Sequence, residues 1–195
     1  MNPVITFHDF LEYMEWSTNT DKLVPILLIK PSTILLLNQD HRINHMFDYY
    51  DRRSGEVQFF LPGYAHYPSL SFMDVFPNHR PFNSDAIALH LTRLRTIYYS
   101  DNDFIDFIET IEHFAPSFRY YGNTELLFLK YISKKGSNHG RFDFSDLHRY
   151  NISDIYHSNP RSLEHILEAI LHAIKNSKND SMLIEEISEL FQLQS

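Results

Sequence analysis

The clearest pattern in the chain lies between residues 33 and 67, where two apolar runs flank an amphipathic segment. Thr33–Leu37 and Val57–Leu61 are short and almost continuously apolar, as strands covered on both faces are. Between them, His41–Arg52 places its apolar side chains on one stripe at helical spacing. The stretch predicts a strand–helix–strand unit that is stopped by Pro62-Gly63 and whose ends frame a possible site.

Other helices are predicted from capping residues and from apolar side chains spaced three and four residues apart. Thr6 with Asp9 caps a first helix, and Ser100 with Asp103 caps another. A helix from Ser84 to Tyr98 is predicted between them, with a buried stripe of Ile87, Leu91, Leu94 and Tyr98. Near the C-terminus, Asn159-Pro160 opens the most regular helix. A last helix from Ser181 is expected to fold back antiparallel on it.

Further strands are predicted where short apolar runs end in turn residues. Val24–Ile29 precedes the strand–helix–strand unit, and Phe118–Tyr121 and Glu125–Ile132 flank the turn at Gly122-Asn123. Residues 65–83 show no periodicity, only prolines interleaved with aromatic side chains, and they predict a long structured loop.

This order of elements predicts one α/β domain over residues 1–195. We expect a small central sheet of four or five strands, at least partly parallel, with helices on both faces and a C-terminal helix pair at about 159–193. The alternative is an α+β fold with a mixed sheet, which would follow if residues 24–37 or 118–132 form antiparallel hairpins.

Composition narrows the classes of function. The chain has no cysteine, which excludes disulfides, thiolate catalysis and cysteine-ligated metals. A formal net charge of −8 disfavours nucleic acid as a partner. The first residues lack the pattern of a secretory signal, and the longest apolar region is too interrupted to span a bilayer, so we expect a cytoplasmic protein without membrane contact.

Histidines at helical spacing are the first chemical candidate. His41, His45 and Asp48 share one face of the predicted helix, as metal ligands must. That face lies opposite the apolar stripe, where solvent is expected. The same objection applies to a second set in the C-terminal region, because its face also lies opposite an apolar stripe. This set is His165, Glu168 and His172. We therefore predict no metal and no cofactor.

A second candidate follows from sheet topology, because ligands of open α/β sheets bind beyond the carboxyl ends of the strands. Those ends would carry Asp40 and His41 after the first strand of the unit and a Gly-Tyr-Ala-His-Tyr segment after the second. Asp40, His41 and His66 are suited to proton transfer or hydroxyl binding. The residues predicted to bind ligand are Gly63, Tyr64, His66 and Tyr67. Turn formation and helix capping explain the same residues without a ligand.

The third candidate is Glu125, which lies at the mouth of an apolar strand beside Tyr120, Tyr121 and Gly122. A carboxyl group among apolar and aromatic neighbours tends toward a raised pKa, which suits acid–base catalysis at a glycosidic or N-glycosidic bond. Most such mechanisms need a second carboxylate, for which Asp143 and Asp146 are candidates. If Gly122-Asn123 simply turns a hairpin, Glu125 points to water instead.

Two functions from different classes remain, because no phosphate loop, dinucleotide fingerprint or nucleophile elbow occurs in the chain. The first is a non-catalytic partner or regulatory subunit of a cytosolic assembly, which binds another protein or a second copy of itself, with Phe72 and Phe76 in the aromatic loop as contact residues. The second is a small enzyme acting on a nucleotide-like or sugar-bearing ligand, with Glu125, Asp40 and His41 as its catalytic groups.

Overall fold

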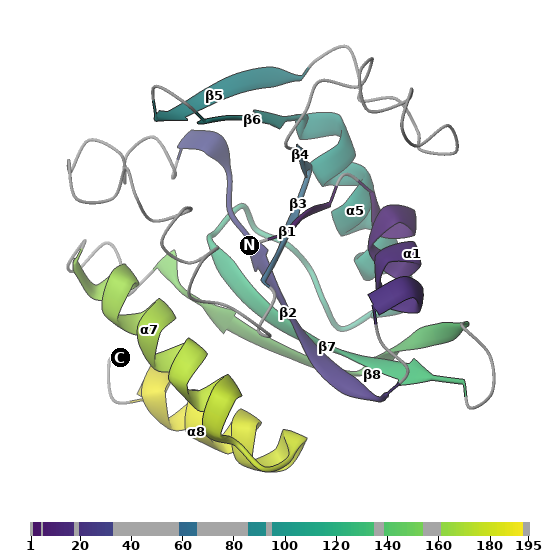
Figure 1. The fold of residues 1–195 in the computed structure, drawn as a ribbon, viewed down its shortest axis with the longest axis vertical. Coiled ribbons are helices and arrows are strands. Elements are labelled where there is room, and N and C mark those ends of the chain that lie inside the picture. The colour runs from purple at the N-terminus through teal and green to yellow at the C-terminus, as the bar shows by residue number, and fades with distance from the viewer. Residues whose placement is uncertain are drawn as a thin grey trace.

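A five-stranded mixed sheet forms the centre of the fold (Figure 1). The structure is a computed structural model that describes residues 2–4, 6–17, 20–32, 59–65, 86–92, 95–134, 139–153 and 161–192. The strands of the sheet follow the spatial order β1–β3–β2–β7–β8. Their bounds are β1 Asn2–Val4, β2 Lys22–Leu28, β3 Phe60–Pro62, β7 Glu125–Ser133 and β8 Gly140–Asn151.

The directions of these strands confirm the predicted fold class. β3 runs parallel to both of its neighbours, β1 and β2. β7 runs antiparallel to β2 and to β8. The protein is therefore α/β with a partly parallel sheet. The interior strand β2 is buried at every position from Leu23 to Leu28, because helices cover both faces of the sheet.

Helices pack on opposite faces of the sheet, α1 and α5 on one and α7 and α8 on the other (Figure 1). Side chains of β8 show both contacts. Phe142 stacks on Phe10 of α1, with ring centroids 4.6 Å apart. The hydroxyl of Tyr150 is hydrogen-bonded to that of Ser188 of α8 at 3.0 Å. The helix bounds are α1 Phe7–Ser17, α5 Asp101–Phe114, α7 Arg161–Asn176 and α8 Asp180–Gln192.

Capping residues set the starts of α1 and α5 as the sequence predicts. Thr6 and Asp9 bond reciprocally: the Thr6 backbone N–H donates to the Asp9 carboxylate at 2.9 Å, and the Asp9 N–H donates to the Thr6 hydroxyl at 3.2 Å. The Ser100 hydroxyl accepts from the Asp103 N–H at 3.1 Å. Each helix buries apolar side chains, among them Phe10 of α1 and Phe107 of α5, which have no exposed surface.

The predicted C-terminal helix pair is confirmed. α7 buries Ile166, Leu167 and Ile170 completely, and α8 buries Leu183 and Ile187. A short polar link at residues 177–179 joins the two helices, which contact each other. Their apolar faces are therefore shared with each other and with the sheet.

The predicted helix from Ser84 to Tyr98 is wrong. Its described part forms two antiparallel strands, β5 Ile87–Thr92 and β6 Arg95–Tyr99, which build a second sheet with β4 Tyr64–Ala65 in the order β4–β6–β5. The sequence of β5, IALHLT, alternates large apolar residues with smaller or polar ones, and β6, RTIYY, is rich in β-branched and aromatic residues. Both features favour strands, and the pairing outweighed a helical spacing that the same residues also fit.

The region around β7 needs two further corrections. Phe118–Tyr121 is not a strand: the Tyr120 N–H donates to the Glu112 carboxylate of α5 at 2.8 Å, so this segment is tied to a helix instead of to a sheet neighbour. β8, which pairs along β7, is not predicted from the sequence. β8 is an edge strand whose positions are mostly half-buried, so it lacks the continuous apolar run that identified β2 and β7.

Several predictions lie outside the described residues, including the strand Thr33–Leu37, the helix His41–Arg52 and nearly all of the 65–83 loop. The Val57–Leu61 strand is described from Phe59 onward and continues through Pro62 as β3. No helix within the described part of the chain combines the length and apolar character needed to cross a bilayer.

Candidate functional site

The carboxyl ends of the parallel strands meet at one edge of the central sheet. Val4 at the end of β1 lies opposite Pro62 at the end of β3, and Leu28 ends β2 beside them. Because β7 is antiparallel to β2, its first residue, Glu125, lies opposite Leu28 at the same edge. Asn151, the last residue of β8, lies opposite Glu125. The structure thus brings Glu125, the third candidate of the sequence analysis, to the edge where Gly63 of the second candidate directly follows β3.

Glu125 is a buried carboxyl group at this edge. Its side chain has no exposed surface, and its Oε1 accepts a hydrogen bond from Nη2 of Arg149. Its Oε2 is buried and has no hydrogen-bond partner among the described residues. Burial raises the pKa of the carboxyl group, and this effect is opposed by the hydrogen bond and the charge of Arg149. The direction of this shift is the one expected for Glu125 from the sequence.

Arg149 carries the positive charge of the site. Its guanidinium lies 5.4 Å from the ring centroid of Phe118 and 5.6 Å from that of Tyr121, within the range of cation–π attraction. The Arg149 side chain is 32% exposed and that of Tyr121 is mostly exposed, so the charge and the ring are both accessible from solvent. A guanidinium has five N–H donors, more than the bond to Glu125 uses.

Tyr120 supplies a second buried polar atom at the site. Its hydroxyl has no hydrogen bond among the described residues, and its ring packs edge-on against Phe104 with centroids 5.6 Å apart. Burial raises the pKa of this hydroxyl far above its usual range, and the negative charges of Glu125 and Asp101 raise it further. We call Phe118, Tyr120, Tyr121, Glu125 and Arg149 the Glu125 cluster.

A second pair of charged groups lies close to the Glu125 cluster. Lys30 Nζ is 3.7 Å from Oδ1 of Asp101, and the same oxygen accepts a hydrogen bond from the Tyr99 hydroxyl at 2.9 Å. Lys30 also lies 5.8 Å from the ring centroid of Phe104, the ring that Tyr120 packs against. The edge therefore carries two accessible cations, one from the end of β2 and one from β8.

Gly63 and Tyr64, two of the predicted ligand-binding residues, have packing roles in the structure. Gly63 adopts a φ of +75°, and a Cβ there would lie 2.7 Å from the Cβ of Phe104, so the glycine allows α5 to approach the chain closely. The Tyr64 side chain is fully buried and its hydroxyl donates to the Ile29 carbonyl at 2.7 Å. Ligand binding by these two residues stays a prediction.

The other predicted site residues fall into two groups. Asp40, His41, His66, Tyr67, Phe72 and Phe76 lie outside the described residues. The structure describes Asp143 and Asp146, but neither lies beside Glu125. Asp143 lies opposite Lys130, five residues along β7 from Glu125, a separation of roughly 16 Å at the usual rise of a strand. Asp146 pairs with His148 instead.

No metal site is formed within the described ranges, where three or more potential ligands never gather. His165 and His172 are exposed on α7, as expected for a solvated face.

The residues of the site that the sequence does not predict are Arg149, Lys30 and Asp101. No local signal marks Arg149, because only the pairing of β7 with β8 brings it to Glu125, 24 residues away in sequence.

Comparison of the chain with protein-family models, with curated proteins and with solved structures finds no match.

Proposed function

We propose that the protein is a small enzyme that binds a nucleotide-like or sugar-bearing ligand at the Glu125 cluster. The observation that supports this proposal is one cluster with two buried polar atoms, Glu125 Oε2 and the Tyr120 hydroxyl, that lack partners among the described residues. A buried polar atom that lacks a hydrogen bond costs about 1–3 kcal/mol, so native proteins rarely keep one without a reason. A ligand hydroxyl that bonds to both atoms would remove this cost.

The accessible groups around these atoms indicate the class of ligand. The N–H donors of Arg149 that the bond to Glu125 does not use suit a phosphate or carboxylate, which a guanidinium binds in a bidentate manner. The exposed ring of Tyr121, next to Arg149, offers a face on which a base or sugar can stack. A ligand with an anionic group, a ring and a hydroxyl fits this set of partners.

The reaction in this proposal is cleavage of a glycosidic or N-glycosidic bond. A raised pKa keeps Glu125 protonated to a higher pH than an ordinary glutamate, which suits it to donate a proton to the leaving atom as the bond to the anomeric carbon breaks. Water then adds to that carbon, and its proton returns to the Glu125 carboxylate. Asp40 and His41 stay in the proposal as further acid–base groups and lie outside the described residues.

Incubation of the protein with a panel of nucleosides, nucleotides and nitrophenyl glycosides tests the proposal, with product release followed by chromatography and absorbance. We expect at least one compound to be cleaved and Glu125→Gln to abolish the turnover without lowering the melting temperature. Glu185→Gln, on the exposed surface of α8, is the matched control. Turnover that survives Glu125→Gln would remove Glu125 from the reaction, and a variant that unfolds would make Glu125 structural.

A second function, a non-catalytic partner or regulatory subunit of a cytoplasmic assembly, is favoured by exposed aromatic side chains. Trp16 is 86% exposed and Phe114 is 56% exposed. Large aromatic residues are enriched at the cores of protein interfaces. Alanine at Phe72 and Phe76 should disrupt the assembly without unfolding the chain. A complex that survives both changes would argue against their role as contact residues.

A further inference from the structure

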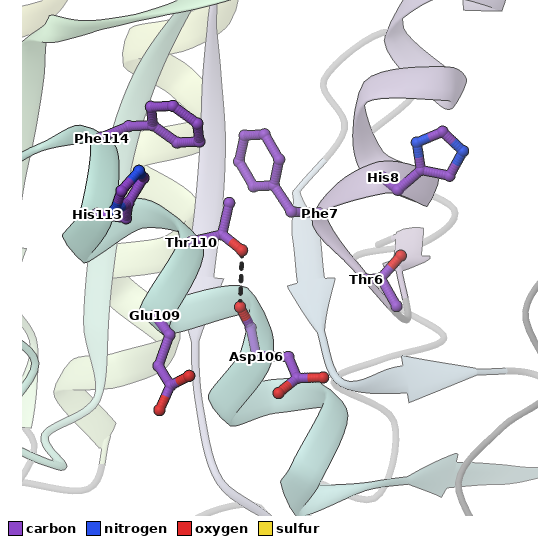
Figure 2. Close-up of a pocket in the computed structure, with 8 residues that line it drawn as sticks. All are labelled: Thr6, Phe7, His8, Asp106, Glu109, Thr110, His113 and Phe114. Carbon is purple, nitrogen blue, oxygen red and sulfur yellow. Dashed lines mark hydrogen bonds between the residues drawn. The ribbon is translucent and has the colours of Figure 1, made fainter.

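A cavity of about 680 Å³ lies between the first turn of α1 and the C-terminal half of α5. It is separate from the Glu125 cluster and shares none of its residues. Figure 2 shows side chains from both helices around it. The lining residues are Thr6, Phe7, His8, Asp106, Glu109, Thr110, His113 and Phe114.

One end of this cavity is aromatic. Phe7 comes from α1 and Phe114 from α5, and their rings lie together at the same end (Figure 2). Both rings pack on Phe144 of β8, with centroids 5.7 Å and 5.1 Å away, and the ring of Phe114 is nearly parallel to that of Phe144. The aromatic end therefore rests on the sheet, yet more than half of the Phe114 side chain faces solvent.

The other end of the cavity is acidic. Asp106 and Glu109 extend their carboxylates away from the aromatic end (Figure 2). The described lining includes two carboxylates and no lysine or arginine. The whole chain has a formal net charge of −8, which adds to the negative potential at this surface. Within one cavity the protein thus presents an apolar surface beside negative charge.

We propose that this cavity docks a basic amphipathic segment of a partner protein. An apolar side chain of the partner packs between Phe7 and Phe114, and a lysine or arginine next to it pairs with Asp106 and Glu109. The charge complementarity selects a basic partner over a second copy of this chain, since two copies would bring like charges together. The proposal rests on the partner-binding function proposed above and gives that function a surface and a partner chemistry.

The test is a titration of ¹⁵N-labelled protein with a helical peptide that carries lysine on one face and leucine on the other. We expect amide shifts at the first turn of α1 and along the C-terminal half of α5, and binding that weakens as salt is added. A peptide with glutamate in place of lysine should not bind. Absence of shifts with the lysine peptide, or shifts confined to other elements, would overturn the proposal.

Two variants separate the acidic and the aromatic contributions. Glu109→Lys and Phe114→Ala should each weaken binding of the lysine peptide about tenfold, the loss typical of one important interface contact. Glu185→Lys and Trp16→Ala change an exposed acid and an exposed aromatic outside the cavity, and they should bind as the wild type does. Circular dichroism shows whether each variant is folded. Unchanged binding by the folded Glu109→Lys and Phe114→Ala proteins contradicts the proposal.

Sedimentation of the same proteins distinguishes the remaining outcomes. Self-association of the wild type that Phe114→Ala abolishes would identify a second copy as the occupant and overturn the basic partner. If a complex with a partner protein persists in both Glu109→Lys and Phe114→Ala, the protein still acts as a subunit. This cavity is then not its binding surface. Loss of that complex in both variants, but not in Glu185→Lys, is the result we expect.

Discussion

Glu125 and Arg149 form an ion pair across neighbouring strands at one edge of the central sheet, 24 residues apart in sequence. The pair is asymmetric. Glu125 is fully buried, whereas the side chain of Arg149 is 32% exposed. Arg149 satisfies one carboxylate oxygen, and the other is left without a partner among the described residues. This asymmetry determines how each residue should respond to substitution.

Glu125→Gln should change stability in a pH-dependent way. Burial raises the pKa of Glu125 above 4.5 in the folded protein, so between that value and the raised one only the unfolded chain has lost its proton. Stability of the wild type therefore falls as pH rises through this window. Glutamine does not titrate, so the melting temperature of the variant should rise relative to that of the wild type as pH increases above about 4.5. If the difference in melting temperature between variant and wild type stays constant or shrinks as pH rises, the raised pKa of Glu125 is contradicted.

Arg149→Ala should destabilise the protein at neutral pH, because it leaves a buried carboxylate without its charge partner. The loss should stay below the roughly 3–5 kcal/mol typical of a fully buried pair, since Arg149 is partly exposed. Adding Glu125→Gln to Arg149→Ala should restore most of the stability, and urea unfolding of the four proteins in this cycle measures the coupling. Additive effects would mean that the two side chains do not stabilise each other.

Tyr120→Phe and Tyr64→Phe remove two buried hydroxyls with opposite expected effects. The Tyr120 hydroxyl has no partner among the described residues, so its removal should leave stability unchanged or increase it. The Tyr64 hydroxyl donates to the Ile29 carbonyl at 2.7 Å, and its removal should cost about 1–3 kcal/mol. If the proposed site is correct, Tyr120→Phe should also weaken ligand binding. Equal destabilisation by both changes would show that Tyr120 is bonded within the protein.

Gly63→Ala and Gly122→Ala compare two glycines with positive φ. Their φ angles are +75° and +86°, so alanine is strained at both. Only at Gly63 does a Cβ meet other atoms, with Phe104 Cβ 2.7 Å away, whereas Gly122 has nothing within 4 Å. Gly122→Ala should cost about 1–2 kcal/mol, the usual cost of the left-handed conformation for alanine. Gly63→Ala should lower the free energy of unfolding clearly more than Gly122→Ala does, as measured by thermal unfolding. Similar losses of stability in the two variants would argue against close packing of α5 on Gly63.

The elements that the sequence predicts well depend on local interactions. The starts of α1 and α5 follow from cap residues three positions apart, such as Ser100 and Asp103, and α7 follows from apolar spacing within one helix. The predicted helix Ser84–Tyr98 is wrong because its apolar residues fit a helical stripe as well as strand alternation. Tertiary pairing of β5 and β6 selected the strand.

The candidate site shows the same division. Glu125 was identified from its apolar and aromatic neighbours in sequence, and burial raises its pKa as expected. Arg149 carried no such signal, because it lies in an edge strand of mixed polarity and reaches Glu125 only through the β7–β8 register. The proximity of Tyr120 to Asp101 likewise depends on how α5 packs. Predicting contacts between distant segments requires the strand order, and the periodicity along one strand does not reveal that order.

Native mass spectrometry of the protein, purified gently from its own cells, tests the central claim that the Glu125 cluster binds a small ligand. The account predicts a bound small-molecule mass on the wild type that is lost from Arg149→Ala with Glu125→Gln, while the control Glu185→Gln retains it. A wild-type protein that carries no small molecule, or one whose ligand persists in the double variant, would contradict the claim.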